Sequence, residues 1–283
     1  MKTHYPFPSI NQFRHAIRDL KNRACYVGKD DNGDPVYDWT KPLPKVLFQG
    51  TVKLHGTNAA IVLDLNTHDI YAQSREHVIS PEKDNAGFAR WVADNQAAIQ
   101  QMILRRFDGL SRPEKIVIFG EWAGKGVFSN VGVGQLPKMF IPFGAKHISG
   151  EEAEWAAHGW VDCPEINIYN IGRAPTYEVE IDLAYPEACL AKLEELTAQV
   201  GAECPFAKLL GATAENGPII GEGIVWKPVG DLDYRFAFKV KDEKHQKQSI
   251  SIKGLAVNRE IQEKIAVFCG ENKSPRFSFE FVD

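Results

Sequence analysis

Short apolar segments with strand character recur along this chain, and helical segments fall between them at irregular intervals. A parallel sheet needs a long crossover, usually a helix, after each strand, whereas antiparallel strands can be joined by short turns. The irregular order therefore favours an α+β fold over a doubly wound parallel sheet. The segments with strand character are residues 46–53, 58–65, 115–122, 138–143, 219–227 and 235–241, and the last two are predicted to pair.

Four other segments combine apolar residues at helical spacing with residue types that start or end helices. They are residues 9–20 with Ser9 as the cap, a segment from Asp84 or Asn85 to about Phe107, one that begins at Pro186, and one bracketed by Asn258 and Gly270. Residues 29–44 are dense in Asp, Gly and Pro, with a turn signal at Asn32-Gly33, and predict a hairpin or a loop.

Composition narrows the class of protein. Apolar residues make up 44% of the chain and charged residues 25%, which is ordinary for a soluble globular protein. The 33 basic against 37 acidic side chains disfavour a protein that coats nucleic acid, but not an enzyme that meets nucleic acid over a small surface. The longest stretch without a charged residue, 126–137, is too short for a membrane span. The N-terminus has no apolar run and the five cysteines are scattered, so we expect a cytoplasmic protein with reduced thiols and no membrane contact.

Two glycine-rich segments fail as nucleotide-binding loops. The segment from Gly120 to Gly126 has three residues between its first two glycines where a phosphate loop has four, and Gly126 follows Lys125 where Ser or Thr should bind magnesium. Residues 132–134 lack the third glycine of a dinucleotide fingerprint, because Pro137 stands at that position. The eight histidines show no zinc-ligand spacing. We therefore reject these motifs.

A more informative set of segments begins at a strand end, with Lys53-Leu54-His55-Gly56-Thr57-Asn58. Taken alone, these residues also fit a turn with a solvated lysine. Four further segments follow in order along the chain. They are Gln73-Ser74-Arg75, Phe119-Gly120-Glu121-Trp122, Glu222-Gly223-Ile224-Val225-Trp226-Lys227 and Phe238-Lys239-Val240-Lys241. The period of a strand places the last two lysines on one face.

This ordered set resembles the covalent nucleotidyltransferase superfamily, which contains polynucleotide ligases and mRNA capping enzymes. Within it, His55 and Thr57-Asn58 resemble the RNA ligase 2-like ATP-dependent RNA ligases, because DNA ligases usually carry Asp or Asn at the position of His55. The resemblance spans residues 46–241. It implies an α+β nucleotidyltransferase (ATP-grasp-like) domain of two packed antiparallel sheets with flanking helices and a nucleotide groove between the sheets.

By this resemblance Lys53 is the nucleophile that attacks the α-phosphate of ATP, expels pyrophosphate and carries AMP. A lysine amine, with a reference pKa of about 10.4, must lose its proton before it attacks, and nearby cations favour the neutral form. Lys239 and Lys241 would supply those cations and contact the phosphates, so we count them as catalytic with Lys53. Glu222 and Glu121 offer hard oxygen ligands for Mg²⁺ or Mn²⁺.

The resemblance implies further contacts to the nucleotide. Arg75 and Glu121 would hold the ribose. Phe143 either stacks on the purine or belongs to the core, and Lys227 either contacts the purine or phosphates or is solvated. His55 either orients the substrate phosphates or bonds a neighbouring carbonyl. The predicted nucleotide-binding residues are Lys53, His55, Asn58, Arg75, Glu121, Phe143, Glu222, Lys227, Lys239 and Lys241.

Three regions are expected: an N-terminal extension over residues 1–45 with a short helix, an adenylation domain over residues 46–241, and a short C-terminal segment over residues 242–283 packed on the same domain. The last is too short for the OB domain of DNA ligases and capping enzymes. Lys244, Lys247 and Lys253 make its beginning basic, either as a solvated surface or as an edge that follows phosphates.

The predicted function is ATP-dependent RNA ligation through lysyl-AMP and an adenylated RNA 5′ end. The expected partners are RNA ends or a nicked RNA duplex, and we expect a monomer. The alternatives are an mRNA capping-type guanylyltransferase, a DNA ligase, and a non-catalytic relative that binds nucleotide or RNA.

Overall fold

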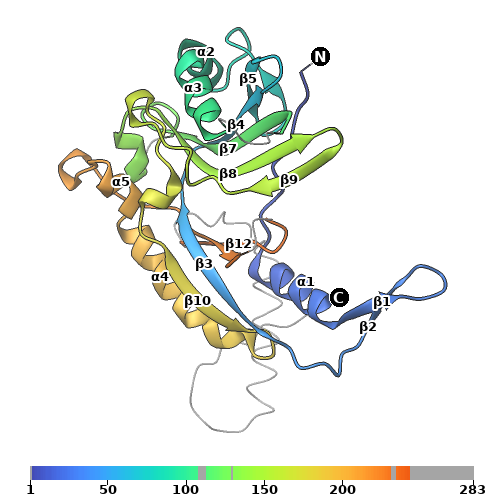
Figure 1. Ribbon diagram of the computed structural model, residues 1–283. Helices are drawn as coiled ribbons and strands as arrows, with labels where there is room; N and C mark the ends of the chain where they lie inside the picture. Colours follow the sequence, from blue (N-terminus) through green and yellow to red (C-terminus); the bar gives the residue numbers. More distant parts are fainter. Residues whose placement is uncertain (1, 108–112, 129, 231–233, 243–283) are drawn as a thin grey trace, which may run out of the picture. The chain divides into compact units, whose positions relative to one another are not determined.

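The computed structural model describes residues 2–107, 113–128, 130–230 and 234–242 (Figure 1). The chain divides into two units, Met1–His245 and Gln246–Asp283. All helices and strands that the structure describes lie in the first unit. The helix predicted between Asn258 and Gly270 and the basic residues from Lys244 onward lie outside the described residues.

The larger sheet has six strands in the order β6-β5-β4-β7-β8-β9, and every neighbouring pair is antiparallel. The predicted strands at 58–65, 115–122 and 138–143 are confirmed as β4, β7 and β8, although β8 runs six residues further, to Ser149. The bounds are β4 Thr57–Asp64, β5 Ile70–Ser74, β6 Val78–Ile79, β7 Lys115–Ala123, β8 Met139–Ser149 and β9 Glu152–Ala156.

The smaller sheet has four strands in the order β10-β3-β11-β12, also antiparallel throughout. The predicted pairing of the last two strands is confirmed, because β11 pairs with β12. The bounds are β3 Lys45–Lys53, β10 Tyr177–Asp182, β11 Gly223–Pro228 and β12 Phe238–Lys241. Two antiparallel sheets with helices beside them confirm the predicted α+β class.

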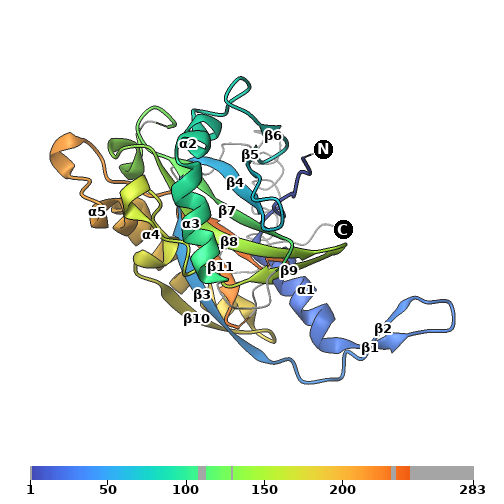
Figure 2. The same ribbon diagram turned by 45° about the horizontal axis from the view of Figure 1, so that its top comes forward.

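The predicted hairpin near residues 29–44 is present as β1 Tyr26–Lys29 and β2 Pro35–Tyr37. Asp30 closes the turn by accepting hydrogen bonds from the backbone N–H groups of Asn32 and Asp34. Figures 1 and 2 both show this hairpin projecting away from the two larger sheets.

Two predicted helices differ from the observed ones. The segment from Asp84 to Phe107 forms two helices, α2 Phe88–Asp94 and α3 Gln96–Arg106, because Asn95 leaves helical geometry and its side chain bonds the carbonyl of Trp91. Asp84 does bond the first turn of α2, through the N–H groups of Ala89 and Arg90.

The predicted helix behind Ser9 was wrong at its start. The helix α1 spans Phe13–Cys25 and its N-cap position is Gln12. The Ser9 hydroxyl instead accepts a hydrogen bond from Arg75. The hydroxyl that the local pattern predicts as a helix cap is therefore bound to a residue that is distant in the sequence.

The remaining α-helices, α4 and α5, lie between β10 and β11. As predicted, Pro186 stands in a first turn, that of a 3-10 segment that leads directly into α4. The bounds are α4 Leu190–Ala202 and α5 Pro205–Leu209, with 3-10 segments at Gly132–Gln135, Pro164–Ile166, Ile171–Arg173, Pro186–Cys189 and Ala214–Asn216. Among the described residues, no helix is long and apolar enough to cross a bilayer.

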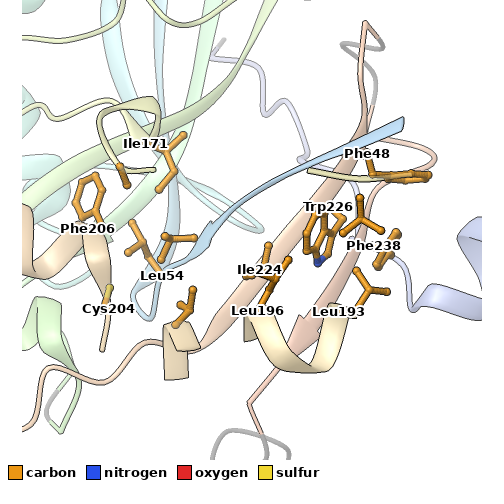
Figure 3. Packing of buried hydrophobic residues seen from close by; sticks show 14 of the residues in the cluster. Phe48, Leu54, Ile171, Leu193, Leu196, Cys204, Phe206, Ile224, Trp226 and Phe238 are labelled. Carbon is orange, nitrogen blue, oxygen red and sulfur yellow. The ribbon is translucent and has the colours of Figure 1, made fainter. Parts of the chain in front are cut away.

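Apolar packing fixes both sheets. Helices α2 and α3 cover one face of the six-stranded sheet with residues that include Phe88 and Ile99. Helix α4 packs Leu193 and Leu196 against β11 and β12, where Trp226 and Phe238 are fully buried (Figure 3). Burial of such side chains stabilises the fold by roughly 1.5 to 3 kcal/mol each. The strands that carry the site residues are therefore held on rigid supports.

Candidate active site

The register of the smaller sheet brings three charged residues together. Gly223 on β11 pairs with Lys53 on β3 and with Lys241 on β12. Glu222, which precedes Gly223, therefore lies between the two lysines. Its Oε2 is 2.5 Å from the Nζ of Lys53, and its Oε1 is 2.6 Å from the Nζ of Lys241.

Glycine is required at the position next to this carboxylate. Gly223 has a φ of +147°, and a Cβ added there would collide with the backbone carbonyl of Val240 on β12. A side chain would push β12 away from β11. Gly223 thus allows the strand spacing that holds Lys241 against Glu222.

Glu222 is a buried carboxylate with several cationic neighbours. Its side chain is 4% exposed, and His55 Nδ1 lies 3.3 Å from Oε2. Burial alone would raise the pKa of Glu222, but the hydrogen bond from His55 and the charges of Lys53 and Lys241 hold it well below its ordinary value. Glu222 is therefore ionised at neutral pH and acts as a fixed negative charge.

His55 contacts a carboxylate and an aromatic ring of the site. Besides Glu222, its ring meets the ring of Phe128 edge-on, with centroids 4.5 Å apart. The structure places His55 beside a carboxylate of the site, and both roles predicted for His55 stay predictions.

Glu121 lies on β7, in the larger sheet. Its Oε1 accepts a hydrogen bond of 2.9 Å from the N–H of Gly56, and β4 pairs Asn58 directly opposite it. Burial raises the pKa of Glu121 to about 7, the charge of Lys53 opposes the rise, and Glu222 adds to it. Glu121 can therefore hold or release a proton near neutral pH.

Gly56 is needed for a close approach between two backbone segments. A Cβ at Gly56 would lie 2.5 Å from the carbonyl oxygen of Trp122 and 2.8 Å from Cγ of Glu121. The missing side chain lets this loop approach β7, so that the backbone N–H reaches Glu121.

Lys239 and Arg75 add positive charge. Burial, together with the charges of Lys53, Lys241 and Arg75, lowers the pKa of Lys239, and Glu222 partly opposes this. Clustered cations of this kind favour the binding of an anion such as a phosphate.

A cavity of about 380 Å³ joins these groups, and its walls come from both sheets. Most of the predicted nucleotide-binding residues line it: Lys53, His55, Asn58, Arg75, Glu121, Phe143, Glu222 and Lys239. Lys241 reaches the site through its ion pair with Glu222. Lys227 is not in the lining, and its Nζ lies 4.7 Å from the ring centroid of Tyr234, a residue that does line the cavity.

Phe143 both lines the cavity and packs into the surrounding apolar residues. Its ring centroid lies 5.0 Å from that of Phe7 in an edge-on contact, and its carbonyl accepts a hydrogen bond from the hydroxyl of Tyr234. Both predicted roles of Phe143, in stacking and in the core, agree with this position.

Sequence reasoning missed part of the lining. Phe7, Pro8 and Ile10 come from the N-terminal segment, Val225 from β11, and Tyr234 from the segment before β12. Pro6 and Pro8 offered a signal, because a residue before proline disfavours helix and so predicts an extended segment there.

The sequence model of the RNA ligase family matches residues 47–241, more than half of the chain. The chain belongs to the RNA ligase family. The matched region begins on β3 and ends on Lys241, so it contains all the predicted nucleotide-binding residues. No curated protein matches this RNA ligase family member.

Solved structures of the Naegleria gruberi RNA ligase share its fold. A point mutant with ATP and Mn aligns with a TM-score of 0.51 at 15% identity, covering 87% of this chain and 58% of that one. The structure with PPi has a TM-score of 0.52 at 15% identity, covering 88% and 59%. Another point mutant, with AMP and Mn, has a TM-score of 0.52 at 14% identity, covering 87% and 58%. The present chain thus spans less than two thirds of the length of the Naegleria protein.

The carboxylates and other possible ligands at the cavity indicate how a divalent metal ion could bind there. In the part of the chain that the structure describes, no group of three or more His, Cys, Asp or Glu side chains could hold an ion. Glu121 and Glu222 are two carboxylates at one cavity, and Glu222 already makes ion pairs through both oxygens. Mg²⁺ is commonly held by one or two carboxylates together with substrate phosphates. The residues therefore fit an ion shared with a nucleotide and do not form an all-protein cage.

Proposed function

We propose that this RNA ligase family member joins RNA 3′-OH and 5′-phosphate ends by using ATP, through AMP carried on Lys53. The observation that carries the proposal is the position of Lys53. It ends β3 at a cavity with Arg75 and Lys239 in its lining and pairs with the buried Glu222. An amine among cations at a cavity of this size suits attack on the phosphate of a nucleotide.

In the first step the Lys53 amine attacks the α-phosphate of ATP. A P–N bond forms, the bond between the α-phosphorus and the bridging oxygen breaks, and pyrophosphate leaves with that electron pair. Lys53 must first leave its ion pair with Glu222 and lose a proton. The positive charges of Lys239 and Lys241 nearby disfavour a further ammonium group and so favour the neutral amine that attacks.

In the second step the RNA 5′-phosphate attacks the phosphorus of lysyl-AMP, and the P–N bond breaks so that the amine returns to Lys53. In the third step the 3′-hydroxyl attacks the 5′-phosphate and expels AMP. The same cations would stabilise the charge that develops on phosphorus in each step. His55, fixed between Glu222 and Phe128, is placed to orient an entering phosphate.

Glu222 and Glu121 would hold Mg²⁺ or Mn²⁺ together with the phosphates. When bound, the ion would neutralise negative charge on the transferred phosphate. Binding to Glu222 requires that one of its ammonium partners give way, since both carboxylate oxygens are paired.

The structural relatives support ATP as the nucleotide. The Naegleria RNA ligase has been solved with ATP, with AMP and with PPi, which are the substrate and products of such a reaction, and its nucleotide complexes contain Mn. In this proposal residues 46–241 form the adenylation domain, residues 1–45 precede it and residues 242–283 follow it.

The function is tested with each labelled nucleoside triphosphate and Mg²⁺, followed by ligation of a 5′-phosphorylated RNA. We expect covalent labelling by [α-³²P]ATP, release of pyrophosphate, and sealed RNA. Labelling by GTP in place of ATP would indicate a capping-type enzyme. An absence of labelling by every nucleotide would indicate a non-catalytic relative.

A further inference from the structure

The segment before α1 has no regular secondary structure, yet one end of it is bound firmly to the six-stranded sheet. We call residues 3–11 the N-terminal strap. The side-chain amide of Gln73 on β5 makes two hydrogen bonds with the backbone of Tyr5, of 3.0 Å from the N–H and 2.5 Å to the carbonyl. The hydroxyl of Tyr71 donates to the carbonyl of Thr3 at 2.7 Å. Because Gln73 is only 2% exposed, the strap satisfies a buried amide that water does not reach.

The other end of the strap is bound to the four-stranded sheet. Asn11 forms a parallel bridge beside β12, in which its N–H donates to the carbonyl of Ala237 and its carbonyl accepts from the N–H of Lys239, each at 3.2 Å. The side chain of Asn11 donates to the carbonyl of Arg235 at 3.0 Å. The strap therefore joins both sheets. Figures 1 and 2 show it running from near β5 toward α1.

Between these two ends the strap forms a wall of the cavity. Phe7, Pro8 and Ile10 are in the lining. The ring of Phe7 meets the rings of Phe143 and Tyr234 with centroids 5.0 and 4.9 Å apart, so the apolar part of the wall is continuous with the cavity.

The strap also reaches a charged group of the site. The Nη2 of Arg75 donates to the Oγ of Ser9 at 3.1 Å, and Arg75 lines the same cavity. The Arg75 side chain is otherwise exposed, and an exposed arginine samples many rotamers. The hydrogen bond to Ser9 favours those rotamers that face the cavity.

We propose that the N-terminal strap is part of the nucleotide site and that Ser9 is a positioning residue, which holds Arg75 toward the bound nucleoside triphosphate. The inference rests on the proposed function for the identity of that ligand. It adds residues outside the five motifs and outside the matched region 47–241. Ligand binding and docking of the strap should favour each other by the same free energy, because the coupling between two binding events is reciprocal.

The first experiment measures ATP binding by calorimetry in EDTA, where no catalysis is required. We expect Ser9→Ala to weaken ATP binding by about 10-fold, the scale of one hydrogen bond to a charged group. Ser9→Thr, which keeps the hydroxyl, should restore most of the affinity. Ser149→Ala removes a hydroxyl from an exposed position at the end of β8 and should bind ATP like the wild type.

The second experiment measures amide hydrogen exchange in peptides that cover residues 3–11, with and without ATP in EDTA. ATP should slow exchange there in the wild type, and less so in Ser9→Ala. In adenylation assays Ser9→Ala should raise the KM for ATP more than it lowers the maximal rate, because the residue acts through Arg75. A purely structural role would change the exchange without that dependence on ATP.

The outcomes separate the two proposals. Wild-type binding of ATP with an unchanged Ser9→Ala affinity, or strap exchange that ATP does not alter, overturns the inference and leaves the proposed function standing. A wild-type protein that binds no ATP, either in EDTA or with Mg²⁺, overturns the proposed function and the nucleotide role of the strap together.

Discussion

Lys53 and Glu222 are 169 positions apart in the chain, yet their side chains meet at 2.5 Å. The contact follows from the register of β3 and β11, in which Lys53 stands opposite Gly223. Val52 on β3 and Ile224 on β11 are buried close to this contact, and their packing holds the two strand ends in place. The nucleophile and its counter-charge are thus set by the sheet itself.

Replacing Glu222 tests that counter-charge. Glu222→Gln keeps the size of the side chain but leaves Lys53 and Lys241 without this negative partner. We expect adenylation to fall by about 10²-fold or more, the scale expected for loss of one charge-stabilising group. The assay is the initial rate of labelling by [α-³²P]ATP. A matched control is Glu180→Gln, which removes a surface ion pair with Lys45 and should change neither rate nor stability. Equal rates in both variants would contradict the role of Glu222.

The two lysines of β12 should act on phosphate. Lys239→Ala and Lys241→Ala should each lower adenylation by about 10²-fold, since each removes a positive charge from the cavity or from its buried carboxylate. Lys192→Ala, on an exposed face of α4, is the control and should behave as the wild type. Loss of a phosphate contact should lower the adenylation rate by about 10²-fold. A rate within about twofold of the wild type for Lys239→Ala would therefore show that Lys239 makes no such contact.

Glu121 should make stability depend on pH. Its pKa is raised from 4.5 to about 7 by burial, so the folded protein retains a proton that the unfolded chain loses. The stability that this proton provides is complete below about pH 4.5 and is lost as pH rises through about 7. As pH rises from about 5 to about 8, we expect the free energy of unfolding of Glu121→Gln to increase by about 1 to 3 kcal/mol relative to that of the wild type.

The measurement is denaturant unfolding of both proteins at the two pH values. Comparing the difference between variants removes the contribution of other groups. For example, burial lowers the pKa of His158 to about 4, so its contribution to the stability of the protein is lost in the opposite direction, as pH falls. A difference between wild type and Glu121→Gln that does not change with pH would show that Glu121 titrates normally.

RNA should be preferred over DNA. The 2′-hydroxyl is the group by which a protein distinguishes the two, so sealing should weaken when the ribonucleotides on the 3′-OH side of a nick are replaced by deoxyribonucleotides. Binding should also weaken steeply with salt, as for any contact made chiefly to phosphates. Matched RNA and DNA nicks are ligated over a salt series. Equal or better sealing of the all-DNA nick would contradict the RNA assignment and leave the Lys53 chemistry untouched.

The parts of this site that sequence reasoning located are those whose signal is local. Lys53, Glu222 and Lys241 each stand at a strand end with neighbours that mark them, and their side chains meet in the structure. The antiparallel class followed from the irregular order of strands and helices. The short strands β5, β9 and β10 lacked a distinctive local pattern, and their neighbours in the sheets hold them in place.

Other features depend on distant partners that no local pattern reveals. Ser9 looks like a helix cap, but Arg75, 66 positions away, takes its hydroxyl. Asn95 stands in the middle of an apolar helical pattern and divides it, because its side chain bonds the preceding turn. Gly56 permits a close approach, and the groups that approach it are Glu121 and Trp122 on another strand.

The most direct test of the proposed chemistry is the position of AMP after reaction with ATP. The protein is incubated with ATP and Mg²⁺, denatured and digested, and the peptides are examined by mass spectrometry. We expect a single adenylated peptide with AMP on Lys53, and no adduct in a folded Lys53→Ala variant. AMP on another residue, or an adduct that persists in Lys53→Ala, would contradict the role of Lys53 as the nucleophile.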